Sequence, residues 1–186
     1  MREKLLKLLV EKSFKYSEEP IFKLASGKTS NYYIDCKKVT LNSEGLLMVG
    51  NMVFEKFASL DIQGVGGLTL GADPIAMAAS LIATQNSKPV NPFVVRKEAK
   101  GHGTGAYIEG IVSQGDNVVI IDDVITTGGS TIKAINRAKN AGFNILKAVV
   151  LVDREEGGRE AIEELGVEVD PVFTKTELFE EYKKNN

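Results

Sequence analysis

The sequence predicts an α/β fold, in which helices flank both faces of a mostly parallel, twisted sheet. Apolar runs rich in Val and Ile, such as residues 118–121 and 148–152, are typical of parallel strands that are buried on both faces. These runs alternate with segments of helical periodicity, as in repeated strand–helix units. No repeat, low-complexity segment or linker divides the chain, so a single domain is expected over residues 1–186.

The first forty residues depart from this alternation, and residues 1–40 are expected to form a small hood over the loops of the sheet. Apolar residues at helical spacing predict a first helix over Arg2–Lys12. Short strands are expected at Phe22–Leu24 and Tyr32–Asp35. Ser43 is a suitable N-cap for the next helix, which is expected to continue through Leu60.

From residue 64 onward, strands and helices alternate. Strands are predicted at Gly64–Gly67, Pro92–Val95, Tyr107–Val112, Val118–Ile121, Ile145–Val152 and Val167–Phe173. Helices are predicted at Pro74–Thr84, Ser130–Ala141, near Arg159–Leu165, and from Glu177 onward. Asp73-Pro74 has the pattern of an N-cap followed by proline at the first helical position. Ligands of such sheets bind beyond the carboxyl ends of the strands, so the functional site is expected there.

Composition narrows the function classes. The formal net charge of −2 gives no general reason to expect nucleic acid or an anionic membrane as a partner. No apolar run approaches the ~20 residues that span a bilayer, and the N-terminus does not resemble a signal peptide. The single Cys36 excludes an intrachain disulfide and suits a reducing compartment. A soluble, cytoplasmic protein is expected.

The stretch from Val118 to Thr131 carries the strongest functional signal. An apolar strand is expected to end at Asp122-Asp123, and a Thr- and Gly-rich turn then opens a helix. The turn offers N–H groups, hydroxyls and a helix dipole of about +0.5 charge, which suit a phosphate. The acids suit sugar hydroxyls or a hard cation. A structural alternative is that the acids only end the strand and that Thr127 or Ser130 only caps the helix. Taken together, the phosphate-binding turn and the paired acids favour a ribose phosphate as the ligand.

A basic, glycine-rich loop lies between two predicted strands. It spans residues 96–106 and contains Arg96, Lys97, Lys100 and the single histidine, His102, with glycines at alternate positions. A solvated charged hairpin is the structural alternative. Such a concentration of cations on a flexible segment favours a loop that closes over a polyanion and neutralises a departing leaving group.

The strand, paired acids and Thr/Gly turn at 118–131 resemble the ribose-phosphate motif of the type I phosphoribosyltransferases. The turn lacks the Gly-Lys-Ser/Thr of a P-loop and the Gly-x-Gly-x-x-Gly of a dinucleotide site. Residues 96–103 match the Arg-Lys-x-x-Lys-x-His-Gly loop of orotate phosphoribosyltransferases. Residues 26–35 match the family's N-terminal Ser-Gly segment, and Asp153-Arg154 its Asp-Arg pair. The chain is therefore similar to orotate phosphoribosyltransferases from about Phe22 to Arg154.

The resemblance implies a reaction and a set of residues. The reaction joins orotate to 5-phosphoribosyl 1-pyrophosphate, giving orotidine 5′-monophosphate and pyrophosphate in pyrimidine biosynthesis. The catalytic residues implied are Lys100, His102, Asp122 and Asp123. The residues expected to contact the donor are Arg96, Lys97, Lys100, His102, Asp122, Asp123, Val124, Ile125, Thr126, Thr127, Gly128, Gly129 and Ser130. Orotate contacts are expected from Arg154, Thr126 and one of Tyr32 and Tyr33, and a pyrophosphate loop at Thr69, Leu70 and Gly71.

Mg²⁺ is the expected cofactor; it is expected to bind through the substrate with no dedicated set of protein ligands, Asp122 and Asp123 being the candidates for any protein contact. The family's active form is a homodimer, so Lys100 and His102 are expected to act on the partner's site.

Two departures from the family pattern matter: Ala25 and Leu70 stand where many members carry lysine. Competing functions are transfer to another base and a non-catalytic sensor of ribose phosphate. The basic loop argues against transfer to another base. The lack of a DNA-reading element and of an excess of positive charge argues against a sensor.

Overall fold

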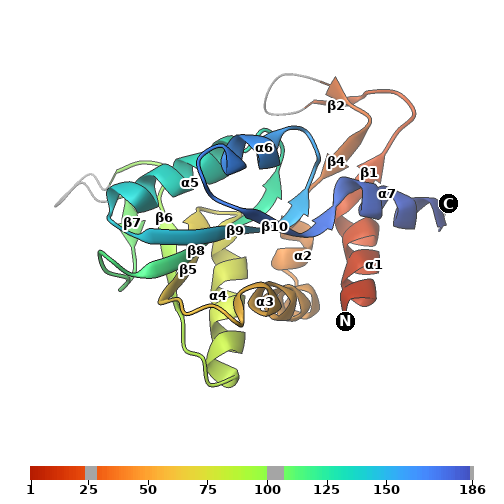
Figure 1. Cartoon of the computed structure of the whole chain (residues 1–186). Helices are drawn as coiled ribbons and strands as arrows, with labels where there is room; N and C mark the ends of the chain where they lie inside the picture. The colour runs from red at the N-terminus through yellow and green to blue at the C-terminus, as the bar shows by residue number, and fades with distance from the viewer. Residues whose placement is uncertain (24–28, 100–106, 185–186) are drawn as a thin grey trace.

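The computed structural model describes residues 1–23, 29–99 and 107–184 (Figure 1). A six-stranded sheet forms its centre, in the order β10-β9-β8-β5-β6-β7. The strands are β5 Gly64–Leu68, β6 Asn91–Val95, β7 Ile108–Glu109, β8 Asn117–Ile125, β9 Asn144–Asp153 and β10 Val169–Thr174. All neighbours pair in parallel except β7, which runs antiparallel to β6. The predicted mostly parallel α/β sheet is confirmed.

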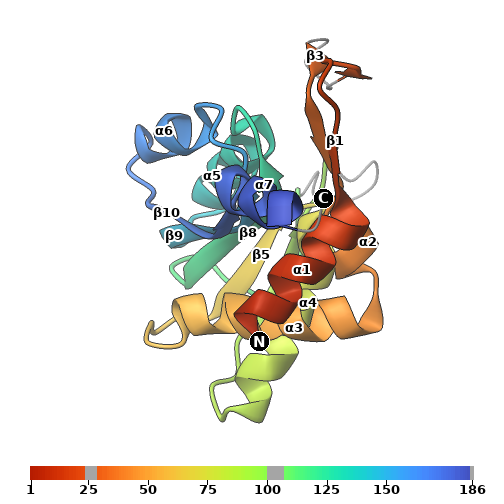
Figure 2. The same ribbon diagram turned by 90° about the vertical axis from the view of Figure 1, so that its right-hand side faces the viewer.

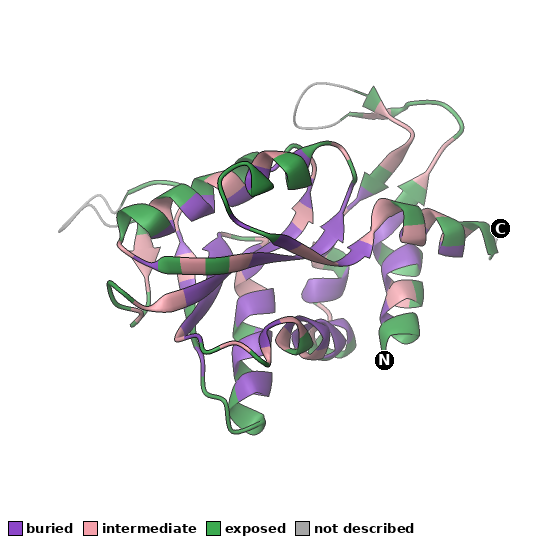
Figure 3. Cartoon of the chain, viewed as in Figure 1, coloured by how far each residue is buried: buried purple, intermediate pink, exposed green. Residues whose placement is uncertain are grey.

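Helices cover both faces of this sheet. The helices α3 (Ser43–Phe57) and α4 (Ala72–Gln85) lie below it in Figure 1, and α5 (Gly129–Asn140) and α6 (Gly158–Glu163) lie above. Successive residues of β8 divide between the two cores, because side chains alternate along a strand. Val119 and Ile121 join the core with α3 and α4, whereas Val118 and Ile120 join the core with α5. The central strands are accordingly buried along most of their length (Figure 3).

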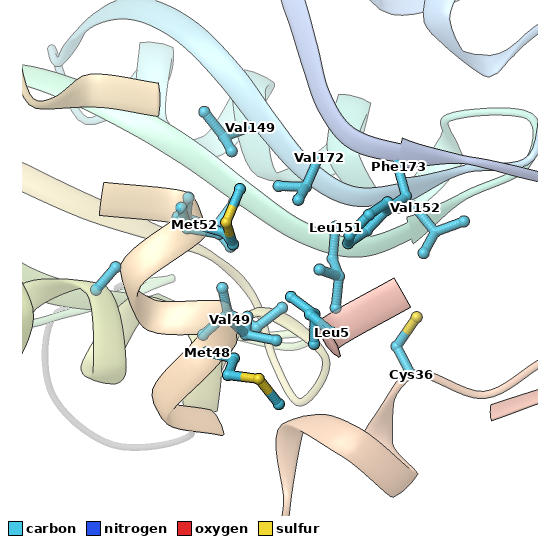
Figure 4. Packing of buried hydrophobic residues seen from close by; sticks show 14 of the residues in the cluster. Leu5, Cys36, Met48, Val49, Met52, Val149, Leu151, Val152, Val172 and Phe173 are labelled. Atoms are coloured by element: carbon cyan, nitrogen blue, oxygen red, sulfur yellow. The ribbon is translucent and has the colours of Figure 1, made fainter. Parts of the chain in front are cut away.

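The larger core also binds the chain termini to the sheet. Figure 4 shows Leu5 of α1 (Arg2–Ser13) among Met48 and Val49 of α3 and Leu151 of β9. The C-terminal helix α7 (Lys175–Lys184) packs against α1, and its Leu178 is fully buried in the same core. The two ends of the chain are therefore held together beside the sheet.

The N-terminal segment between α1 and α3 forms two small antiparallel sheets. Strand β1 (Phe14–Tyr16) pairs with β4 (Tyr32–Ile34), and β2 (Phe22–Lys23) pairs with β3 (Thr29–Ser30). These strands project beyond the main sheet (Figure 2). A short helix, α2 (Lys37–Thr40), then leads back to α3. The elements β1, β3 and α2 were not predicted, since each is too short to show a period.

The strand expected to end at Ile121 continues to Ile125, so the acids lie within β8 and not after it. Pairing with β9 extends as far as Ile125 opposite Asp153, because backbone hydrogen bonding is indifferent to the polarity of the side chains. The strand expected at Tyr107–Val112 is shorter than predicted and spans only Ile108–Glu109.

Two predicted helix caps are wrong. The side chain of Asn42, not that of Ser43, caps α3 by accepting a hydrogen bond from the backbone N–H of Gly45 at 3.0 Å. The helix α4 begins earlier than expected, with Gly71 at its N-cap position. Asp73 therefore lies in the first turn of α4, where its carboxylate accepts a hydrogen bond from the Thr69 hydroxyl at 2.6 Å.

Candidate active site

A cavity of about 680 Å³ opens where β8 and β9 end and α5 begins. Its lining brings together most of the residues predicted to contact a ribose phosphate and a base. They are Tyr33, Asp122, Val124, Ile125, Thr126, Thr127, Gly128, Gly129, Ser130 and Arg154, joined by Lys23, Thr131 and Glu156. The cavity lies beyond the carboxyl ends of parallel strands, as expected for a ligand site of this sheet class.

The turn at 126–130 presents the start of α5 to this cavity. Gly128 is the N-cap residue of α5 with a φ of 79°, in the left-handed region that favours glycine, and no side chain caps the helix. A Cβ at Gly128 would lie 2.9 Å from the carbonyl oxygen of Gly158, so the turn also packs tightly against α6. Thr127 and Ser130 therefore do not serve as caps, and the first N–H groups of α5 remain available to an anion.

The two acids of β8 point to opposite faces of the sheet. Asp122 lies on the α5 side, where its Oδ2 accepts a hydrogen bond from the Thr131 hydroxyl at 2.6 Å, and it lines the cavity. Asp123 is directed to the other side, against Gly71 at the start of α4. Within the described part of the chain, Asp123 is not among the cavity's lining residues.

Both carboxyl groups are buried and close to each other, which disfavours their charged forms. Burial, followed by the neighbouring negative charge of Asp123, raises the pKa of Asp122 to about 7. Burial also raises the pKa of Asp123, although the positive charge of Lys37 opposes this. The Lys37 ammonium lies 3.9 Å from Asp123 Oδ2 and 2.8 Å from Asp35 Oδ1. The site therefore holds an acidic pair with a lysine on one side of it.

Arg154 lies at the far side of the same cavity and is only 5% exposed. Its backbone N–H donates to the Ile125 carbonyl at 3.0 Å, which ties the end of β9 to the end of β8. Its guanidinium donates to Glu156 Oε1 at 2.9 Å and lies 4.8 Å from the Tyr32 ring centroid. Arg154 Nε is buried without a hydrogen-bond partner. A buried N–H donor without a partner is rare in folded proteins and calls for an acceptor that the ligand-free chain does not supply.

The two tyrosines considered as base contacts have different surroundings. Tyr33 is exposed and lines the cavity. Tyr32 instead stacks on Phe14 at 6.4 Å, and its hydroxyl donates to Glu156 Oε1 at 2.7 Å. Burial, together with the Glu156 hydrogen bond, raises the pKa of Tyr32. Tyr33 is therefore the tyrosine that can meet a ligand in the cavity, and Tyr32 supports Arg154 and Glu156.

The remaining predicted residues lie elsewhere. Thr69, Arg96 and Lys97 line a second cavity of about 430 Å³, with Val94, Glu98 and Glu109. The Arg96 guanidinium lies 3.3 Å from the Glu109 carboxylate. Leu70 is exposed, and Gly71 contacts Asp123. Ala25, the Ser26-Gly27 motif, Lys100 and His102 lie outside the described residues.

Three lining residues were absent from the predicted set. Thr131 belongs to the Thr/Gly run and was recognisable as a helix-start hydroxyl. Glu156 and Lys23 had no such signal: an acid after Asp-Arg and a lysine in a two-residue strand are ordinary surface features. Their place in the cavity depends on the packing of the N-terminal strands against the end of β9, which sequence spacing does not reveal.

The described residues offer few oxygen ligands for a metal ion. No group of three or more His, Cys, Asp or Glu side chains in the ranges 1–23, 29–99 and 107–184 is placed to hold a metal ion. Of the two acids of β8, only Asp122 lines the cavity, and its hard carboxylate suits Mg²⁺ when a substrate provides the other oxygens. In the same ranges, no helix is both long and apolar enough to cross a membrane.

Comparison with known proteins agrees with this geometry. Residues 75–177 match the family described as phosphoribosyl transferase domain. The orotate phosphoribosyltransferase of Aquifex aeolicus (strain VF5) is 45% identical over 177 residues, which cover 95% of this chain and 97% of that protein.

Solved structures give the same assignment. Orotate phosphoribosyltransferase of Mycobacterium tuberculosis H37Rv, in complex with Fe(III) dicitrate, superimposes with a TM-score of 0.82 at 35% identity, covering 95% of this chain and 98% of that one. The same enzyme in complex with 5-phospho-α-D-ribosyl 1-diphosphate gives a TM-score of 0.78 at 32% identity, with 95% and 98% of the chains covered. The chain therefore belongs to the orotate phosphoribosyltransferase family.

Proposed function

We propose that this protein transfers the ribose 5-phosphate group of 5-phosphoribosyl 1-pyrophosphate to orotate. The products are orotidine 5′-monophosphate and pyrophosphate, a step of pyrimidine biosynthesis. The observation that supports this most strongly is that one cavity contains a helix start without a side-chain cap, a buried acid and a buried arginine whose Nε has no hydrogen-bond partner. These groups suit, in turn, a phosphate, a ribose and a carboxylate-bearing base. Family membership supports the same reaction.

Different residues are proposed to bind different parts of the two substrates. The N–H groups of the 126–130 turn bind the 5′-phosphate, and Asp122 accepts hydrogen bonds from the ribose hydroxyls and stabilises positive charge that develops at the anomeric carbon. Arg154 binds the orotate carboxylate, since a planar guanidinium matches it in a bidentate manner. Thr126 and Tyr33 complete the base site. Lys100 and His102 neutralise the departing pyrophosphate.

Mg²⁺ is the proposed cofactor. It would be held mainly by the oxygens of the donor, and Asp122, which lines the cavity, is the protein carboxylate that could join them, whereas Asp123 faces the α4 side. When bound, it lowers the negative charge of the pyrophosphate leaving group. Removal of divalent cations by EDTA is expected to abolish turnover, and added Mg²⁺ to restore it. Undiminished activity in EDTA would exclude this role.

We also place the active enzyme in a cytoplasmic homodimer. The outer sides of α3 and α4 carry exposed apolar residues, including Leu47 at 57% and Leu81 at 67% exposure, which suit burial against a second copy. Lys100 and His102 act on the partner's site. Mixed dimers of a Lys100→Ala chain and an Asp122→Asn chain test this sharing. Recovery of activity supports it, and verified mixed dimers without activity would contradict it.

The function is tested by an acceptor panel with orotate and uracil, each supplied with the donor and Mg²⁺. Wild type is expected to consume orotate, followed by its ultraviolet absorbance, and to leave uracil unchanged. Arg154→Ala is expected to lose most orotate turnover, since an unmatched carboxylate in the site costs about 2–5 kcal/mol. Equal use of both bases would indicate a different acceptor. Donor binding without any turnover would indicate a sensor.

A further inference from the structure

Lys37 is a cation that the reaction scheme leaves without a role. It opens α2, immediately after the N-terminal strands, and its side chain is 44% exposed. Its ammonium pairs with Asp35 at 2.8 Å and approaches Asp123 Oδ2 to 3.9 Å. One lysine thus stands between two carboxylates, one of which belongs to the acidic pair of the site.

Asp123 fixes where this ammonium lies relative to the rest of the site. A Cβ built on Gly71 would lie 2.4 Å from Asp123 Oδ1, so the carboxylate packs directly against the 69–71 loop. The other oxygen of the same carboxylate faces Lys37. The 69–71 loop, Asp123 and Lys37 are therefore consecutive neighbours on the α4 side of β8, whereas the phosphate-binding turn lies on the α5 side with Asp122.

This side of the site needs positive charge if it is to receive a pyrophosphate. The 69–71 loop is Thr-Leu-Gly and has no charged side chain. Asp123 and Asp35 would repel an anion that approached the loop. Lys37 lies beside these two acids, and its side chain is exposed enough for its ammonium to contact a ligand while it stays paired with Asp35. A flexible ammonium with three donors can contact a phosphate and a carboxylate together.

We propose that Lys37 contacts the pyrophosphate group of the donor, supplying from α2 the positive charge that the 69–71 loop lacks. This inference rests on the proposed function and assigns Lys37 to one half of the donor. Loss of the ammonium should weaken binding of pyrophosphate itself. Binding of ribose 5-phosphate, which occupies the α5 side, should be unaffected.

The test uses isothermal titration of the full chain with inorganic pyrophosphate plus Mg²⁺, and separately with ribose 5-phosphate. Lys37→Ala and Lys37→Gln are compared with wild type, and Lys37→Arg tests rescue by a conserved charge. Lys38→Ala, an exposed lysine on the same short helix, is the matched control. Loss of a charge-assisted hydrogen bond predicts about tenfold or greater weakening for pyrophosphate. Lys37→Arg and Lys38→Ala should remain within about threefold of wild type.

Each of the following binding results would overturn the assignment of Lys37. Unchanged pyrophosphate binding in Lys37→Gln would show that the ammonium only pairs with Asp35. Equal weakening of both ligands would indicate that Lys37 merely supports the fold or Asp123. Failure of wild type to bind pyrophosphate would also overturn it. The orotate assay is independent: a wild type that binds pyrophosphate through Lys37 but does not consume orotate would refute the proposed function alone.

Discussion

The guanidinium carbon of Arg137 lies 4.0 Å from the centroid of the Tyr107 ring. Arg137 belongs to α5, the helix whose start forms the phosphate-binding turn. The same guanidinium donates to the backbone carbonyls of Arg96 and Lys97, the second at 2.9 Å. It therefore holds both chain segments that border the 100–106 portion of the basic loop, and it couples their position to the helix.

Replacing Arg137 by Met is expected to raise the KM for the donor by roughly fivefold or more, because a cation–π contact and two hydrogen bonds are lost. The KM for orotate should change little, since Arg96 and Lys97 do not line the base cavity. Steady-state kinetics with each substrate varied in turn measure both values. Lys139→Ala, on the exposed side of α5, is the control. Equal increases in the two KM values would indicate a general loss of structure instead.

Much of the fold and of the phosphate site was predictable because local chemistry determines both. The Val118–Ile121 run has no polar face, so it had to lie inside a parallel sheet, and the glycines of the following turn required a special backbone. The end of the strand was misplaced since Asp122 looks like a boundary. The Asp122 carboxylate is accommodated inside β8 by a hydrogen bond from Thr131, the third residue of α5.

The rest of the site depends on contacts that the sequence does not announce. Glu156 meets the Tyr32 hydroxyl across 124 residues, and Lys37 meets Asp123 only after the N-terminal strands fold back on the sheet. No periodicity or spacing encodes such pairings. The opposite orientation of Asp122 and Asp123 follows from strand alternation, yet it becomes visible only when the strand is known to continue past them.

Replacing Glu156 by Gln is expected to destabilise the ligand-free protein, because the Arg154 guanidinium loses its carboxylate partner while buried. The loss is expected to be about 1–3 kcal/mol. Orotate supplies a new carboxylate, so the increase in Tm on adding orotate should be larger in Glu156→Gln than in wild type. Thermal denaturation with and without orotate measures this, and Glu160→Gln, an exposed acid on α6, is the control. An orotate shift no larger than that of wild type would contradict the argument.

Replacing Asp122 by Asn is expected to abolish most activity, by about 100-fold or more, and yet to stabilise the ligand-free protein at pH 8. Burial and the charge of Asp123 raise the pKa of Asp122 to about 7 in the folded protein. Between an unfolded pKa of about 3.9 and pH 7 the folded state holds a proton that the unfolded state releases, so stability falls as pH rises through this window.

Asn has no proton to lose, and its amide oxygen can still accept from Thr131. The free energy of unfolding of the variant should therefore exceed that of wild type by roughly 1–3 kcal/mol at pH 8. Near pH 4 the two values should be equal. Chemical denaturation in EDTA at the two pH values provides the comparison. A stability difference that is the same at both would show that ionisation of Asp122 does not oppose folding.

A second carboxylate should show the opposite dependence on pH. Asp170 of β10 accepts from Lys56 Nζ at 2.6 Å and from Lys147 Nζ at 2.8 Å, which joins β10 to α3 and β9. Burial tends to raise its pKa, but the hydrogen bonds from Lys147 and Lys56 outweigh burial and lower the pKa of Asp170. A lowered folded pKa means that this carboxylate stabilises the fold above its unfolded pKa and ceases to do so as pH falls through the folded value.

Asp170→Asn is accordingly expected to lose about 1–2 kcal/mol of stability at pH 7, between the values for surface and buried ion pairs. The difference from wild type should shrink toward zero as pH falls below the folded pKa of Asp170, where the wild-type carboxyl group is also neutral. Denaturant midpoints measured from pH 7 down to acid conditions follow this convergence. Asp116→Asn, which neutralises a half-buried carboxylate that accepts a hydrogen bond from the Ser113 N–H, is the comparison variant. Because Asp170 lies away from the cavity lining, turnover of orotate at pH 7 should be unchanged. A deficit that persists at low pH would assign the effect to packing and not to charge.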